Sequence, residues 1–217
     1  MKAVNDFLLN LFTGTDELRK NLMFPNSRDG IVYATDSRVV IAIPQESLAL
    51  SYSARDNFPN AERVFADLES SNQTKAVKIK VSDLAKELTR ARIKTDKFLL
   101  ECKECEGSGE VKWKYDDKED ETHYENFECP KCEGHGKEEH HHQFPRISLE
   151  SYDDKGFNIK VKVGKLMFAP FQLFRVFMVA LARGKEEVEL RYTGLEEGCL
   201  VVVDEIRMIV MPLLIKE

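Results

Sequence analysis

Four of the five cysteines of this 217-residue chain lie in two copies of one short motif, separated by 27 positions. The copies are Cys102–Gly109 (CKECEGSG) and Cys129–Gly136 (CPKCEGHG). A C-x-x-C turn brings two thiolates within reach of one metal ion, and two such turns complete a tetrahedral set of sulfurs. Glycine lets the backbone bend toward the thiolates, because it adopts positive φ at little cost. The motifs predict one structural Zn²⁺ site with the ligands Cys102, Cys105, Cys129 and Cys132.

Disulfides and redox chemistry are the less favoured uses of these cysteines. The opening residues do not resemble a secretory signal, so we expect a cytoplasmic protein, and disulfides are rare in that compartment. A redox-active C-x-x-C pair needs electropositive surroundings that lower its thiol pKa, whereas the neighbours here are glutamates. The fifth cysteine, Cys199, lies in an apolar stretch and is expected to be buried and inert.

Histidines near the second motif raise a further alternative. His140, His141 and His142 could hold a second metal ion, but adjacent histidines point in different directions on an extended strand. His135, inside the motif, is expected to be exposed or to contact a metal-bound thiolate, with exposure favoured. One zinc ion therefore remains the prediction for this segment.

The residues between the two motifs predict a β-hairpin. Glu110–Tyr115 and Thr122–Phe127 alternate polar with apolar or aromatic residues, and they flank the polar run Asp116–Glu121. We expect the hairpin to have an acidic tip and a small packed aromatic face, with an exposed patch for a partner as the alternative. The residues of this face are Trp113, Tyr115, Tyr124 and Phe127.

Charge is distributed unevenly along the chain. The net charge is −6, which by itself argues against a general nucleic-acid binder, because neutralising phosphates requires cationic surface. Residues 101–142, however, hold 14 acidic and 6 basic side chains, so the rest of the chain carries +2. The stretch Lys75–Lys97 holds eight cations against three carboxylates. Both charged stretches could be solvated faces, or they could serve different partners.

The periodicity on either side of the cysteine segment predicts an α+β fold. Two β-α-β-β(-β) units form a discontinuous domain, residues 1–101 and 143–217, and residues 102–142 form a zinc-bound hairpin inserted between them. Helices are expected at Asp83–Arg92, capped by Ser82 or Asp83, and at Pro170–Ala182. Strands are expected at 30–36, 38–43, 75–81, 98–100, 157–163, 187–192, 199–203 and 207–215.

Two other segments complete the prediction. Asn5–Phe12 is short and amphipathic, and it is expected to cover a sheet edge, with a partner-facing role as the alternative. Cys199–Val203 and Met208–Ile215 are the longest apolar runs, and both are too short to span a membrane.

Four stretches stand out along the chain: Ala34–Arg38, Phe58–Val64, Asp83–Ile93 and Val210–Leu213. In this order they resemble one domain of the bacterial DNA polymerase sliding clamp. They match its strand-turn signature, its Phe-Pro-x-x-x-Arg-Val stretch, its Asp-Leu-Leu-x-x-Leu-x-Arg helix and its terminal Met-Pro-Met strand. The resemblance covers most of residues 30–101 and 150–217. Separately, the cysteine motifs resemble half of the four-repeat cysteine-rich module of the DnaJ-type co-chaperones.

The clamp resemblance implies partners and site residues. Clamp helices face DNA, and contacts to the phosphate backbone are independent of sequence. The helix 170–182 departs from this pattern, because Arg175 and Arg183 stand among many apolar residues. Clamp rings are built from six such domains, so a clamp role would require several copies of this chain. The implied contacts to double-stranded DNA are Lys86, Arg90, Arg92 and Lys94, and a pocket for partner proteins is implied at Met211 and Leu213.

The sequence therefore favours a non-enzymatic, zinc-containing, clamp-like protein that is associated with DNA or accessory to replication. The alternative is an adaptor that keeps the fold without binding DNA and uses the acidic hairpin or the pocket as its contact surface. An enzyme is poorly supported, because the chain has no phosphate-binding glycine loop, no G-x-S-x-G and no HExxH motif. Asp36, close to Arg38, is interpreted as a turn residue rather than an acid–base catalyst.

Overall fold

The structure is a computed structural model that describes residues 1–14, 17–71, 75–89, 92–96, 99–118, 121–139, 146–150 and 159–214. The chain divides into two compact units. The first unit comprises Met1–Lys94 and Ile147–Glu217, and the second comprises Thr95–Arg146. The predicted zinc segment, 102–142, lies within the second unit.

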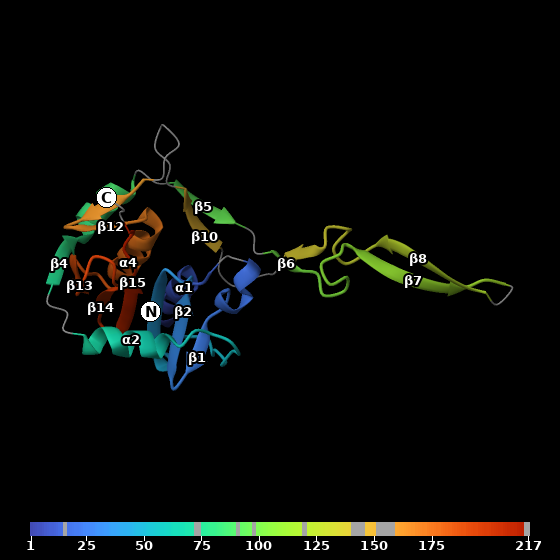
Figure 1. The fold of residues 1–217 in the computed structure, drawn as a ribbon, viewed down its shortest axis with the longest axis horizontal. Coiled ribbons are helices and arrows are strands. Elements are labelled where there is room, and N and C mark those ends of the chain that lie inside the picture. The colour runs from blue at the N-terminus through green and yellow to red at the C-terminus, as the bar shows by residue number, and fades with distance from the viewer. Residues whose placement is uncertain are drawn as a thin grey trace. The chain divides into compact units, whose positions relative to one another are not determined.

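A seven-stranded antiparallel sheet forms the centre of the first unit (Figure 1). Three early strands and three late strands lie as two blocks that join where β15 pairs with β3, and β4 pairs with β13 at the far edge. Together with the helices, this sheet confirms the predicted α+β class. In sheet order, the strands are β1 (Asn26–Arg28), β2 (Ile31–Thr35), β3 (Val39–Pro44), β15 (Ile206–Val210), β14 (Cys199–Val203), β13 (Glu187–Tyr192) and β4 (Lys75–Lys80).

Helices cover both faces of this sheet. On one face, α1 (Lys2–Leu11), α3 (Val81–Leu88) and α4 (Pro170–Ala182) form the main core with residues such as Ile41 and Val201. Helix α2 (Ala61–Ser70) lies on the other face (Figure 1). Its Phe65 packs against strand residues such as Tyr33 and Ile209. Strand side chains alternate between the faces, so each central strand contributes to both layers.

The N-terminal helix is more central than the sequence indicated. The prediction of a cover for a sheet edge is wrong, since α1 contacts β2, β3 and α4 over the sheet face. Leu8, Leu9 and Phe12 have no exposed surface. A short segment read alone shows one apolar stripe, but it does not show how much of the remaining surface its neighbours cover.

The two later helices compare differently with their predictions. Helix α4 has the predicted bounds, begins at Pro170 and is followed by Gly184 with φ +60°. Helix α3 begins at Val81, one residue after Lys80, and Lys80 makes no capping bond through its side chain, so the predicted capping by Ser82 or Asp83 is wrong. The α3 helix also ends at Leu88 rather than Arg92.

The remaining strands form two-stranded sheets. Two pairs lie between β4 and β13 in the sequence: β5 (Arg92–Asp96) with β10 (Arg146–Glu150), and β11 (Val161–Val163) with β12 (Leu166–Phe168). In the second unit, β6 (Leu99–Glu101) pairs with β9 (Lys137–Glu139), and β7 (Glu110–Asp116) pairs with β8 (Thr122–Glu128). The predicted hairpin is therefore present as β7 and β8. Short 3₁₀ helices occupy Glu17–Leu22 and Gln45–Ser47.

Three boundary details complete the comparison with the sequence. Strand β15 ends at Val210, well before the predicted residue 215. Of the predicted strand 157–163, residues 161–163 form β11, while 157 and 158 lie outside the described residues. Within the described part of the chain, no helix is both long and apolar enough to cross a membrane.

Candidate functional site

The four motif cysteines meet in the second unit. Their sulfur atoms all lie within 4.8 Å of one another, and the four side chains are buried. The separations across the motifs are 3.8 Å for Cys102–Cys129 and 3.7 Å for Cys105–Cys132. A regular tetrahedron with Zn–S bonds of about 2.3 Å has sulfur–sulfur edges of about 3.8 Å. The donor set and its spacing are therefore compatible with a zinc site, and all five cysteines are free of disulfides.

The two motifs are arranged as near copies of each other. The amide of Gly109 donates to the sulfur of Cys105 at 3.3 Å, and Gly136 donates to Cys132 at 3.2 Å. Across the motifs, the amide of Cys129 donates to the Gly109 carbonyl at 2.8 Å. The Cys102 amide donates to the Gly136 carbonyl at 2.9 Å. Each motif thus donates one amide to a sulfur of its own and one amide to a carbonyl of the other motif.

Without a metal ion, Cys102 and Cys105 differ in acidity. Burial raises the pKa of Cys102 to about 12. Burial opposes ionisation of Cys105 as well, but hydrogen bonds from the Gly109 amide and from the Cys132 and Cys102 thiols outweigh it and lower its pKa to about 7. A metal ion bound to all four sulfurs requires every thiol to be deprotonated, so its charge has to overcome this burial.

The other predicted residues of this unit fall in several places. His135 is exposed, which agrees with the favoured expectation. His140, His141 and His142 lie outside the described residues. Cys199, in the first unit, has no exposed surface, and burial raises its pKa to about 12. The expectation of a buried, inert thiol is consistent with both properties.

The hairpin does not gather its four aromatic residues on one face. Trp113 pairs with Glu125 and Tyr115 with His123, so these residues share a face with Phe127. Tyr124 pairs with Lys114 on the opposite face. Trp113 and Phe127 make an edge contact at 5.8 Å, yet all four rings remain about half exposed. The alternation of a strand separates neighbours of odd spacing, which explains the placement of Tyr124.

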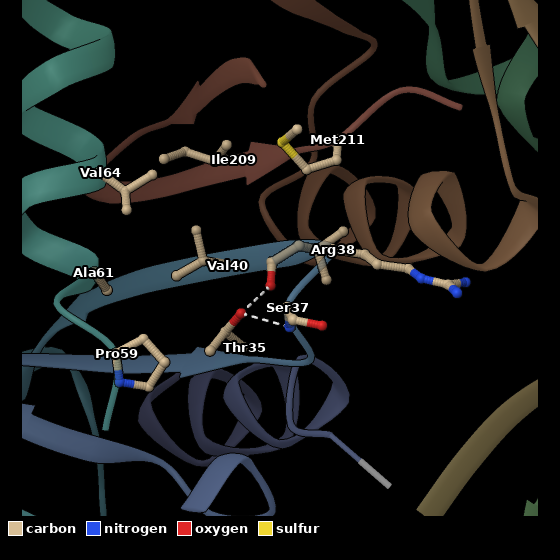
Figure 2. A pocket seen from close by; sticks show the side chains of 10 residues that line it. Thr35, Ser37, Arg38, Val40, Pro59, Ala61, Val64, Ile209 and Met211 are labelled. Carbon is tan, nitrogen blue, oxygen red and sulfur yellow. Dashed lines mark hydrogen bonds between the residues drawn. The ribbon is translucent and has the colours of Figure 1, made fainter. Parts of the chain in front are cut away.

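A second candidate site is an apolar pocket in the first unit (Figure 2). Its volume is about 260 Å³, slightly below the ~300–1,000 Å³ of sites for whole small molecules. This size suits a few side chains of a partner segment better than a complete cofactor. Ten residues from β2, β3, α2, β15 and the adjoining loops line it: Thr35, Ser37, Arg38, Val39, Val40, Pro59, Ala61, Val64, Ile209 and Met211.

Hydrogen bonds among side chains, backbone amides and backbone carbonyls hold the rim of this pocket in place. The Thr35 hydroxyl donates to the Val39 carbonyl and accepts from the Ser37 amide (Figure 2). The Met211 amide donates to the Arg38 carbonyl at 2.9 Å, and the Gln172 side chain donates to the Met211 carbonyl at 2.7 Å. In Figure 2 the Arg38 guanidinium extends away from the apolar side chains, which leaves Val40, Val64 and Ile209 to form the walls.

A buried ion pair supports the turn between β2 and β3. Asp36 accepts the amides of Arg38 and Val39 through Oδ1, and its Oδ2 accepts a 2.6 Å bond from Arg175. The Arg175 side chain is only 2% exposed, also donates to the Leu11 carbonyl, and lies 4.1 Å over the Phe171 ring. Burial lowers the pKa of Arg175, and Asp36 opposes this shift. Asp36 is thus a turn residue, as expected, with an additional partner on α4.

The sequence did not reveal the positioning roles of Arg175 and Gln172. In the sequence Arg175 is one of two arginines in or next to an apolar helix, whereas in the structure its side chain is buried and paired with Asp36. An arginine among aromatic residues on an apolar helix is the signal that could have indicated a buried partner. Gln172 is likewise buried, and it accepts the Ala169 amide at the helix start. Neither side chain could be linked to the pocket without the fold.

The implied partner and DNA residues are only partly described. Met211 lines the pocket, whereas Leu213 is not among its lining residues and its amide bonds the Met167 carbonyl. Lys86 is exposed on α3 and pairs with Asp83 at 3.2 Å. Arg90 lies outside the described residues, and Arg92 and Lys94 belong to β5, where the backbone alone is described. Arg92 thus begins a strand and does not end the predicted helix Asp83–Arg92.

Known proteins match this chain only at the level of structure. No family model matches it, and no curated protein matches its sequence. The beta sliding clamp of C. crescentus matches with 12% identity and a TM-score of 0.46 over 98% of this chain and 65% of that one. The DNA polymerase sliding clamp of Bacillus subtilis matches with 11% identity and a TM-score of 0.48 over 99% of this chain and 62% of that one. The DNA polymerase III beta subunit of Thermotoga maritima matches with 11% identity and a TM-score of 0.46 over 99% of this chain and 65% of that one. The chain thus spans less than two thirds of each.

Proposed function

We propose that this chain is a non-enzymatic, clamp-like binding protein, associated with DNA or accessory to replication, that receives a protein segment in its apolar pocket. The single observation that carries this proposal is where the clamp-like stretches meet. Residues of Ala34–Arg38, Phe58–Val64 and Val210–Leu213, which are far apart in the sequence, line one cavity. A site for a partner is a more economical explanation of this convergence than three unrelated structural roles.

The pocket chemistry supports an apolar partner segment. Valine, isoleucine, methionine and proline side chains form most of its walls. Its polar groups at Thr35 are already satisfied by the neighbouring backbone. A ligand therefore gains by burying apolar side chains, and the rim arginine Arg38 can add a polar contact at the edge.

Variants of two equally exposed valines test the pocket. Val64 is 45% exposed in the pocket, while Val202 is 49% exposed and is not among the lining residues. An array of overlapping peptides from the replication proteins of the source genome would be probed with both aspartate variants. We expect Val64→Asp to abolish binding of an apolar subset and Val202→Asp to retain it. Equal behaviour of the two variants, or an array with no bound peptide, would refute the pocket proposal.

For the second unit, we propose one structural zinc ion held by Cys102, Cys105, Cys129 and Cys132. Four sulfur ligands leave no open coordination position, so the ion would stabilise the unit without supplying a catalytic water. The proposal draws support from the tetrahedral sulfur spacing and from the amides directed at Cys105 and Cys132. One bound metal ion per chain is expected. Purified protein that holds no metal and has four titratable thiols in the two motifs would refute the proposal.

Sequence-independent binding to double-stranded DNA is a separate part of the proposal. Lys86, Arg90, Arg92 and Lys94 are its proposed contacts, and log Kd is expected to rise with log salt concentration. Binding of duplex DNA would be measured at low and high salt, both for the unchanged chain and for the double variant Arg90→Glu/Arg92→Glu. Absence of binding at low salt, or binding that this variant leaves unchanged, would contradict the DNA part alone.

An adaptor without DNA binding is the second candidate, and the described helices favour it. The exposed charges of α3 are Asp83, Lys86 and Glu87, which give no net positive surface. Arg175 of α4 is buried, and Arg183, just after α4, pairs with Glu205. Sedimentation in solution separates the candidates, because a ring requires several copies of the chain and an adaptor can act as a monomer.

A further inference from the structure

One face of the β7–β8 hairpin carries aromatic rings and a carboxylate that have no role in the zinc site. Cross-strand pairing places Trp113 beside Glu125 and Tyr115 beside His123, with Phe127 next along the same face. Trp113 is 57% exposed, and Tyr115 and Phe127 are about half exposed. The zinc-site cluster reaches only as far as Val111 at the base of this face. Most of the aromatic surface is therefore available to a partner.

The opposite face shows what such a ring can hold. There, the Lys112 ammonium lies 4.5 Å from the centroid of Tyr124, so that ring already has a cation. Among the described residues, no lysine or arginine lies over Trp113, Tyr115 or Phe127. Cations over exposed tryptophan faces are attracted by the ring quadrupole. The two faces of the hairpin thus differ in whether the cation is supplied by the chain itself.

The carboxylate of Glu125, like the Trp113 ring, is not paired with a cation of the chain among the described residues. It is exposed beside Trp113, and within the part of the chain that the structure describes it has no salt-bridge or hydrogen-bond partner. By contrast, the nearby His123 is paired with Asp117 at 2.7 Å and stacked on Tyr115 at 5.1 Å. An arginine side chain suits the neighbouring Trp113 ring and Glu125 carboxylate, because its planar guanidinium can stack on an aromatic ring and also bond a carboxylate.

The charge of the segment selects the class of partner. Residues 101–142 carry a net charge of −8, which repels the phosphates of nucleic acids but attracts basic protein segments. On the aromatic face itself, Glu125 is the only carboxylate of the paired residues 111–115 and 123–127 that points with Trp113. We infer that this face, defined by Trp113, Tyr115, Glu125 and Phe127, binds an arginine- or lysine-bearing segment of another protein.

This inference is independent of the pocket and DNA proposals, because it concerns only residues of the second unit. In it, Trp113 receives the cation on its ring while Glu125 pairs with the charged group. Tyr115 and Phe127 then cover the aliphatic part of the same segment. The association would be weak to moderate and salt-sensitive, since all the groups are solvent-exposed.

The experiment uses the full-length chain and three probes. These are a fluorescein-labelled peptide of alternating arginine and threonine, the same peptide with glutamate in place of arginine, and single-stranded oligo-dT. Trp113 is the only tryptophan of the chain, so its emission reports directly on this face. We expect the arginine peptide alone to change the emission saturably, and added salt to reverse the change. Failure to bind, or a Trp113-dependent response to oligo-dT, would overturn the inference.

Matched variants on the two faces make the test specific. Trp113→Ala and Glu125→Gln are expected to raise the Kd of the arginine peptide, measured by anisotropy, by about three- to tenfold each. Their controls on the opposite face are Tyr124→Ala, which removes an equally exposed ring, and Glu110→Gln, which removes the same charge. The controls should leave Kd within about twofold. Equal losses from both faces would show only general attraction to an acidic hairpin and would refute the assigned face.

Discussion

Alanine at the second glycine of each cysteine motif is expected to weaken zinc binding far more than alanine at the first. Gly107 and Gly109 both have positive φ, +84° and +81°. A Cβ on Gly107 would meet only the flexible side chain of Glu101, at 3.3 Å. A Cβ on Gly109 would lie 2.3 Å from the carbonyl oxygen of Gly134, where real Cβ contacts essentially never come below 3.0 Å. The two alanine variants therefore share the backbone strain and differ in the clash.

The magnitude follows from these two contributions. Placing alanine at positive φ costs about 1–2 kcal/mol at either position. At Gly109 the backbone of the partner motif must also move, which costs a further ~2 kcal/mol, because overpacking typically costs about 1–3 kcal/mol. The carbonyl of Gly109 accepts the Cys129 amide at 2.8 Å, so a shift there also disturbs one of the proposed zinc ligands. Because metal binding and folding are coupled in such sites, the extra ~2 kcal/mol corresponds to about 30-fold weaker zinc binding.

The assay is competition for zinc between each variant and a chromophoric chelator, with Co²⁺ absorption as a check of thiolate ligation. We expect Gly107→Ala to weaken binding by about five- to 30-fold, and Gly109→Ala to weaken it by about 30-fold more than that. The second motif supplies an independent pair, because a Cβ on Gly136 lies 2.3 Å from the Gly107 carbonyl, whereas one on Gly134 meets only Glu128. Equal affinities within either pair would refute the steric argument.

Three further predictions concern the ion pair, the thiols and pH. Arg175→Met should cost about 3 kcal/mol in chemical denaturation, because it leaves Asp36 and the Leu11 carbonyl without their partner; additive effects of Arg175→Met and Asp36→Asn would argue against their coupling. In the metal-bound protein none of the five thiols should react with Ellman's reagent, and four should react after the metal is removed by a chelator. Cys199 should react only after denaturation, and labelling of Cys199 before denaturation would contradict its burial. Zinc affinity should rise with pH between about 6 and 8, since binding displaces protons from thiols such as Cys102, whose pKa is raised to about 12; a flat profile would refute this.

The secondary structure was predictable where local signals were strong. Pro170 and Gly184 bracket α4, and strict alternation identified the β7–β8 hairpin. The end of α3 was missed because its charged pattern continues past Leu88, while the chain enters the strand β5 at Arg92. Its N-terminus was missed because good capping residues at 82 and 83 lie inside the first turn. Local preference sets such boundaries only weakly, since packing and strand pairing compete with it.

The candidate sites divide in the same way. The cysteines could be identified from spacing alone, because a C-x-x-C turn is local and its chemistry belongs to the residue type. The pocket could be expected near Met211 only through the family resemblance, and its walls come from residues more than 170 positions apart in the sequence. Arg175 illustrates the limit, since the same charge would serve DNA on an exposed helix but supports a turn when buried.

Spacing and residue chemistry were thus enough to establish the thiol set, the hairpin, the acidic segment and the α+β class. They act through neighbouring backbone geometry, which a short stretch of chain carries with it wherever it folds. Contacts between distant stretches settled the remaining questions: which glycine faces a carbonyl of the other motif, which arginine is buried against Asp36, and which aromatic rings share a face. Those outcomes depend on strand register and on burial by other elements, which a local pattern does not encode.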